Sequence, residues 1–277
     1  MASLISAAAL MAAAGSEHWV VIDCRHDLAD PAAGEAAWRE AHIPGAVFMH
    51  LDRDLSAPKT GRNGRHPLPS PEVFATLLGR HGITPDHHVV AYDDAGGMFA
   101  ARLWWMLRWV GHADVSVLDG GLAAWRAAGG TLDTSVRERP ATVRVPHPAL
   151  PVVDAATVLA NIDSGRLLLV DARAPDRFRG ENETLDPVGG HIPGAVNRYF
   201  KLSLADDGRF KPADMLRAEW RAITGERAAA SLVMQCGSGV TACHNLLALE
   251  VAGLPGASLY PGSWSEWCSD PARPVTR

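Results

Sequence analysis

The chain of 277 residues carries the sequence His-Ile-Pro-Gly-Ala-Val twice, at residues 42–47 and again at residues 191–196. The two copies lie 149 residues apart (191 − 42), a period far longer than the 20–50 residues of solenoid repeats. Before each copy, a short apolar stretch ends in Asp-x-Arg, at residues 20–25 and 168–173. This arrangement predicts a domain that occurs twice rather than an array of short repeats.

A second pair of matching segments supports the duplication. Residues 118–125 correspond to residues 260–267, with an offset of 142 (267 − 125). Within each copy, short apolar strands alternate with helical segments, as at residues 89–92 and 100–109. Such alternation is typical of an α/β fold in which a mainly parallel sheet has helices on both faces.

A proline-rich stretch separates the two copies. Residues 135–150 contain three prolines and show little periodicity, which is typical of a linker. We therefore predict an N-terminal domain at residues 1–134 and a C-terminal domain at residues 151–277. Residues 1–15 are apolar but lack the basic start of a signal peptide, so we expect them to contribute a first helix.

The chemistry of the chain is indicated by residues 236–241, Cys-Gly-Ser-Gly-Val-Thr, which lie between an apolar stretch and a segment of helical spacing. Gly237 and Gly239 allow the backbone to curl with its N–H groups pointing inward, and the start of the helix adds positive potential. Both features favour the anionic form of the Cys236 sulfur, which is the nucleophilic form. A small buried cysteine beside a turn is the alternative, but it does not account for the glycines and hydroxyl residues that follow.

The same loop excludes one kind of enzyme and indicates one active site per chain. A cysteine phosphatase needs an arginine after five intervening residues to bind phosphate, and that position is Ala242. With the offset of 142, Cys236 corresponds to Asp94 in the first copy. The first domain is therefore expected to have no nucleophile in this loop.

Composition restricts the partners and the compartment. The net charge is −5, the pI is near 6.2, and no block of like charges occurs, which argues against nucleic acid or an anionic membrane as a partner. The four cysteines form no CxxC pair and no metal-like cluster with histidine, so we expect neither a metal nor a cofactor. A reactive unpaired thiol favours a reducing compartment, and we predict the cytoplasm. No apolar run approaches the roughly 20 residues of a membrane span.

The combination of motifs resembles the tandem-domain rhodanese sulfurtransferases. The resemblance rests on the two His-Ile-Pro-Gly-Ala segments, the pair Trp104-Trp105, the sequence Gly-Ser-Trp-Ser-Glu-Trp at residues 262–267, and the cysteine loop. The loop is similar to that of 3-mercaptopyruvate sulfurtransferases, whereas thiosulfate-preferring members tend to carry a bulkier, more basic loop. The resemblance implies two tandem rhodanese-like domains, of which only the second is catalytic.

The resemblance also implies an activity. A sulfurtransferase of this kind moves a sulfane sulfur from 3-mercaptopyruvate to a thiol or cyanide through a persulfide on Cys236. The acceptor would be a thioredoxin-like protein or a low-molecular-weight thiol. Two alternatives are thiosulfate:cyanide sulfurtransfer and a persulfide carrier that serves a protein partner.

Site residues follow from the same resemblance. In the mercaptopyruvate enzymes the loop serine, here Ser238, works with a histidine and an aspartate, which correspond to His66 and Asp52. The expected substrate-binding residues are Arg177 and the loop residues Gly237, Gly239, Val240 and Thr241.

One position departs from the family pattern. The second arginine that holds the substrate carboxylate is replaced by Asp186. We expect this exchange to weaken mercaptopyruvate binding unless another base substitutes, with Arg179 and Arg198 as the candidates.

Overall fold

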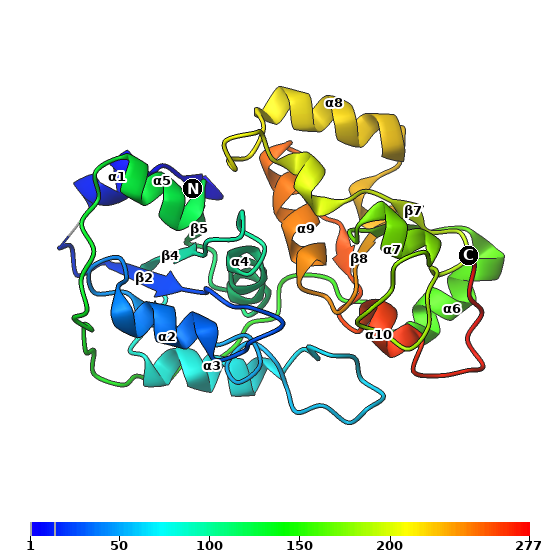
Figure 1. The fold of residues 1–277 in the computed structure, drawn as a ribbon. Coiled ribbons are helices and arrows are strands. Elements are labelled where there is room, and N and C mark those ends of the chain that lie inside the picture. The colour runs from blue at the N-terminus through cyan, green and yellow to red at the C-terminus, as the bar shows by residue number, and fades with distance from the viewer. Residues whose placement is uncertain (1, 14) are drawn as a thin grey trace. The chain divides into compact units, whose positions relative to one another are not determined.

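The computed structural model describes residues 2–13 and 15–277 and divides the chain into two compact units (Figure 1). The first unit contains residues up to Ala57, Pro69–Ala149 and Asp206–Phe210. The second unit contains Pro58–Leu68, Leu150–Ala205 and Lys211–Arg277. The two units are therefore not two continuous halves of the chain, because Pro58–Leu68 packs with the second unit. We call Pro58–Leu68 the exchanged segment. The sequential boundaries 1–134, 135–150 and 151–277 stay a prediction.

The first unit is built on a five-stranded parallel sheet with the strand order β1-β5-β4-β2-β3. Its strands are β1 (Leu4–Ile5), β2 (Trp19–Asp23), β3 (Val47–Phe48), β4 (His88–Tyr92) and β5 (Val115–Leu118). Its helices are α1 (Ala7–Ala12), α2 (Ala33–Glu40), α3 (Pro71–Arg80), α4 (Ala100–Trp109) and α5 (Gly121–Ala127). The strand β4 is buried along its whole length, as expected for a parallel strand covered on both faces.

The second unit repeats this design with a four-stranded parallel sheet in the order β7-β6-β8-β9. Its strands are β6 (Leu168–Asp171), β7 (Val196–Asn197), β8 (Leu232–Gln235) and β9 (Ser258–Leu259). Its helices are α6 (Ala155–Ser164), α7 (Pro175–Arg179), α8 (Ala213–Thr224), α9 (Thr241–Val251) and α10 (Ser263–Trp267), with short 3-10 turns at Phe200–Ser203 and Ala229–Ser231. The prediction of an α/β fold with two parallel sheets is confirmed.

The repeated motifs bind one another in the same way in both units. At the end of β2, Arg25 forms a buried ion pair with Asp23 and donates to the carbonyl of Ala41, the residue before the first His-Ile-Pro-Gly. At the end of β6, Arg173 pairs with Asp171 and donates to the carbonyl of Gly190, before the second His-Ile-Pro-Gly. The same contacts in both copies explain why Asp-x-Arg and His-Ile-Pro-Gly recur together. In each unit the arginine connects the end of one strand to the segment that leads into the next strand.

Helix α1 begins after Ser6, whose hydroxyl accepts from the Ala9 N–H at 3.2 Å, as in an ordinary N-cap. The prediction of a helix near the start of the chain is therefore confirmed for Ala7–Ala12, while residues 1 and 14 lie outside the described residues. Across residues 2–13 and 15–277, we find no helix with the length and apolar character that crossing a membrane requires.

Candidate active site

Cys236 lies directly after β8, where the chain turns into α9, and only 2% of its surface is exposed. The backbone N–H groups of Ser238 and Gly239 point at its Sγ, at 3.4 and 3.1 Å. Donors in this arrangement stabilise negative charge on sulfur. The structure therefore gives the loop the inward-pointing N–H groups that the glycine pattern predicts.

The loop is held by two serines of α10. Ser263 Oγ accepts from the N–H of Cys236 at 3.0 Å, and the N–H of Ser265 donates to the carbonyl of Gly237 at 2.9 Å. Gly239 has a φ of +79°, and a Cβ there would lie 2.3 Å from the carbonyl oxygen of Pro261. Glycine at 239 is therefore required both by its backbone conformation and by the close approach of a neighbouring strand end.

The corresponding loop of the first unit holds an anion of its own. Strand registers pair Asp23 with Tyr92 and Asp171 with Gln235, so the residue that corresponds to Cys236 is Asp93. The offset of 142 predicts Asp94 instead, and this assignment is wrong because the chain from the strand end to the matching segments is 26 residues long in the first unit (118 − 92) and 25 in the second (260 − 235).

The buried Asp93 carboxylate shows what this loop design does. Its Oδ1 accepts from the N–H groups of Ala95 and Gly97, and its Oδ2 accepts from those of Phe99 and Ala100, all within 2.8–2.9 Å. In one unit the inward N–H groups bind a carboxylate, and in the other they bind the cysteine sulfur. Both loops thus direct backbone N–H groups at an acceptor atom of the residue that directly follows the strand, β4 in the first unit and β8 in the second.

Ser238 and His66 meet in the second unit. His66 Nδ1 lies 2.7 Å from Ser238 Oγ, and both residues are buried. His66 belongs to the exchanged segment, which brings it to the cysteine loop across 172 residues of sequence. The structure therefore brings together the serine and histidine that the family resemblance implied.

Asp52 lies in the first unit, where its Oδ2 is 3.9 Å from His26 Nε2. Its action on His66 stays a prediction. Ligand atoms of His26, His50 and Asp52 lie within 4.8 Å of one another, but both ring nitrogens of His50 bind the backbone, at Pro31 and at Asp52. The cluster therefore gives no support for a metal site.

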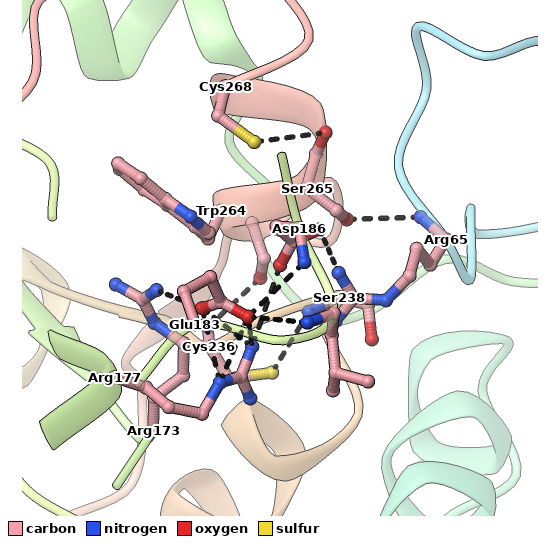
Figure 2. A network of polar contacts seen from close by, with 12 residues as sticks. Arg65, Arg173, Arg177, Glu183, Asp186, Cys236, Ser238, Trp264, Ser265 and Cys268 are labelled. Carbon is pink, nitrogen blue, oxygen red and sulfur yellow. Dashed lines mark hydrogen bonds and ion pairs between the residues drawn. The ribbon is translucent and has the colours of Figure 1, made fainter. Parts of the chain in front are cut away.

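Arg177 lies beside the loop in a network of charged side chains (Figure 2). It binds both carboxylate oxygens of Glu183 through Nε and Nη2, at 2.8–3.2 Å. Burial opposes ionisation of Glu183, but hydrogen bonds from Arg177 and from the Leu185 N–H outweigh it and lower the pKa of this carboxyl. Arg177 is thus a charged group with a fixed partner, and about a fifth of its side chain remains exposed.

Asp186 contacts two arginines of this network. It forms an ion pair with Arg65, and its Oδ2 lies 3.5 Å from Arg177 Nη2. Burial raises the pKa of Asp186, although the contact with Arg65 opposes this shift. The two bases suggested from the sequence are engaged elsewhere: the exposed Arg179 pairs with Glu181, and the buried Arg198 pairs with Glu219 and lies over the ring of Trp220.

Arg65 was not among the residues expected at the site. No motif marks Arg65 in the sequence, where it is one of many arginines. Its partners Asp186 and Ser265 lie 121 and 200 residues further along the chain. Its position next to His66 and the absence of a side chain at Gly237 are the two features that could have indicated it.

This fold and loop define a protein of the rhodanese class. The Rhodanese-like domain family matches residues 6–128 and again residues 154–270, and the chain belongs to this family. The prediction of two tandem rhodanese-like domains is thereby confirmed.

Its relatives are named as sulfurtransferases. A probable 3-mercaptopyruvate sulfurtransferase of Pseudomonas aeruginosa is 50% identical over 277 residues, covering 99% of this chain and 98% of its own. The thiosulfate sulfurtransferase of Bos taurus is 39% identical, covering 82% and 77%. The solved 3-mercaptopyruvate sulfurtransferase of Leishmania major has a TM-score of 0.85 at 30% identity, covering 96% of this chain and 74% of its own.

Proposed function

We propose that the chain is a sulfurtransferase that moves a sulfane sulfur from 3-mercaptopyruvate to a thiol or cyanide through a persulfide on Cys236. The observation that carries the proposal is the pair of backbone N–H groups, from Ser238 and Gly239, that point at the Cys236 sulfur. Relatives named as 3-mercaptopyruvate and thiosulfate sulfurtransferases support an enzyme of the sulfurtransferase class EC 2.8.1.

The reaction has two displacement steps. The Cys236 thiolate attacks the sulfur of the donor and forms a new S–S bond, while the C–S bond breaks and its electron pair stays with the carbon fragment. That fragment takes up a proton and leaves as pyruvate. The acceptor thiolate or cyanide then attacks the outer sulfur of the persulfide, and Cys236 is released as a thiolate.

The loop and its neighbours support both steps. The N–H groups that point at Cys236 Sγ stabilise the thiolate before attack and after release, much as an oxyanion hole stabilises developing charge. Ser238 and His66, at 2.7 Å, form a route for the proton that the carbon fragment needs. We assign Gly237, Gly239, Val240 and Thr241 to the binding of the transferred sulfur, and Asp52 to the orientation of His66.

Thiosulfate is the second candidate donor. Two guanidinium groups, of Arg65 and Arg177, lie beside the loop, and each has part of its side chain exposed for hydrogen bonds to the oxygens of a dianion. Relatives from Mycobacterium tuberculosis that are 44% identical are named putative thiosulfate sulfurtransferases.

The acceptor and the compartment complete the proposal. We assign the sulfur to a thiol acceptor, either a thioredoxin-like protein or a low-molecular-weight thiol. All four cysteines are free, which supports a reducing compartment such as the cytoplasm.

Mass spectrometry after treatment with 3-mercaptopyruvate tests the mechanism. One added sulfur should appear on the peptide that contains Cys236, and Cys236→Ser should abolish both the label and turnover. Cys24→Ser is the matched control, because Cys24 is equally buried, at 2% exposed, and burial raises its pKa well above the usual range. Full turnover by Cys236→Ser, or a label that moves to Cys24, would exclude the proposed mechanism.

A further inference from the structure

Gly237, the residue after the reactive cysteine, leaves a space that an arginine fills. A Cβ at position 237 would lie 2.8 Å from Arg65 Nη2 and 3.6–3.7 Å from the two terminal nitrogens of Arg177. The two guanidinium groups therefore lie against the backbone of the loop at Gly237, and Figure 2 shows both arginines in the network around Cys236. Positive charge reaches the loop from other segments rather than from a side chain of the loop itself.

Several contacts fix the exchanged segment where Arg65 lies. The N–H of Arg65 donates to Ser265 Oγ at 3.0 Å, and the same hydroxyl donates to the carbonyl of Gly262. A Cβ at Gly64 would lie 2.9 Å from that carbonyl oxygen, so the two backbones are in close contact. Since Ser265 also donates its N–H to Gly237, one residue holds both Arg65 and the loop.

The side chain of Arg65 has a buried counter-ion and an accessible head. Asp186 pairs with it and is only 2% exposed, whereas 27% of the Arg65 side chain is exposed. Asp186 Oδ2 is buried without a hydrogen bond, and Glu183 binds Arg177 from the same segment. The carboxylates of Asp186 and Glu183 fix the two guanidinium groups in place, and part of each arginine side chain remains exposed to a ligand.

We propose that Arg65 is a donor-specificity residue that, together with Arg177, binds the anionic oxygen group of the sulfur donor beside Cys236. Guanidinium groups suit this role because their planar fork matches a carboxylate or a sulfonate oxygen pair. The group bound is a carboxylate in 3-mercaptopyruvate and a sulfonate in thiosulfate. The inference rests on the proposed sulfurtransferase function.

Steady-state kinetics with both donors tests the role of Arg65. Arg65→Ala should raise KM about tenfold to a hundredfold for at least one donor, the range for loss of a charged hydrogen bond, with a smaller change in kcat. The donor with the larger rise identifies the group that Arg65 binds. Arg62→Ala, an exposed arginine of the same segment, is the control and should leave both KM values unchanged.

A second variant avoids leaving Asp186 buried without its partner. Gly237 is not among the glycines with positive φ, so Gly237→Ala is compatible with the backbone and acts by displacing Arg65. It should raise KM in the wild-type background but add little in Arg65→Ala, since the guanidinium is then already absent. Independent, additive effects of the two substitutions would overturn the inference.

The two proposals fail in different ways. If saturating donor puts a sulfur on Cys236 of the wild-type protein, while Arg65→Ala and Gly237→Ala leave KM unchanged for both donors, only the role of Arg65 is refuted. If the wild-type protein takes up no sulfur on Cys236, the proposed function itself is refuted.

Discussion

At the scale of single residues, Ser238 makes two contacts whose proposed functions experiment can separate. Its backbone N–H points at the Cys236 sulfur, and its hydroxyl lies 2.7 Å from His66 Nδ1. In the proposed reaction, the first contact stabilises the sulfur whichever donor is used. The second matters only where a proton must move, and thiosulfate carries no such proton.

Ser238→Ala should therefore lower kcat/KM for 3-mercaptopyruvate by about a hundredfold, a typical loss for proton transfer by a positioned group, and affect thiosulfate much less. Comparing the two donors on one preparation measures the difference. Ser231→Ala, whose hydroxyl binds the Ala228 carbonyl at the other end of β8, serves as the control. Equal losses on both donors would mean that the Ser238 hydroxyl only shapes the loop.

At the scale of elements, the turn from β8 into α9 depends on one glycine with two constraints. Gly239 has a φ of +79° and a backbone oxygen close to where its Cβ would be. Gly208 has the same φ of +79° but no atom within 4 Å of that position. Comparing these two glycines separates backbone strain from steric exclusion.

Gly208→Ala should cost about 1–2 kcal/mol of stability, the usual cost of a left-handed backbone for a residue with a Cβ. Gly239→Ala should cost more, because Pro261 must also move, and its displaced N–H should slow alkylation of Cys236 by iodoacetamide. Urea unfolding and the alkylation rate measure the two effects. If both variants lose the same stability and react at the wild-type rate, the contact with Pro261 has no consequence.

The elements themselves were largely predictable from the sequence. The duplicated Asp-x-Arg and His-Ile-Pro-Gly motifs indicated two α/β units, because each motif marks the same strand end and crossover. The cysteine loop was also predictable, since its glycines lie where the backbone must curl. The correspondence of Cys236 with Asp93 was not, because the offset between the later matching segments, 142, is one residue smaller than the offset between the two strand ends, 143 (235 − 92).

At the scale of the whole molecule, the duplication has produced two loops of the same design that hold different acceptor side chains. The first holds Asp93, which is 1% exposed and bound by four backbone N–H groups. The second holds Cys236, whose sulfur accepts from two. The first loop is satisfied by its own carboxylate, which makes it a structural element of the first unit.

Asp93→Asn tests this interpretation. An amide retains one acceptor oxygen and turns an NH2 group toward two buried N–H donors, at an expected cost of about 2–6 kcal/mol for the two. Asp94→Asn is the matched control, because Asp94 is the exposed neighbour and should unfold at the wild-type urea concentration. A larger loss of stability for Asp94→Asn than for Asp93→Asn would contradict the structural role of Asp93.

The position of Arg65 beside the cysteine loop could not be predicted from the sequence. Its contacts join residues that lie 121 and 200 positions apart, and no periodicity or local motif encodes such a pair. The family resemblance predicted His66 because members of the family have a histidine that works with the loop serine. It implied nothing about the arginine beside His66.

The exchanged segment also determines how late during translation the candidate active site can assemble. Residues 58–68 leave the ribosome before Asp186, Ser238 and Ser265, the residues they contact, have been synthesised. Neither half of the duplicated chain carries both His66 and Ser238. Translation must therefore run almost to the end before this site can assemble, and a break in the chain between the halves would leave each product without part of it.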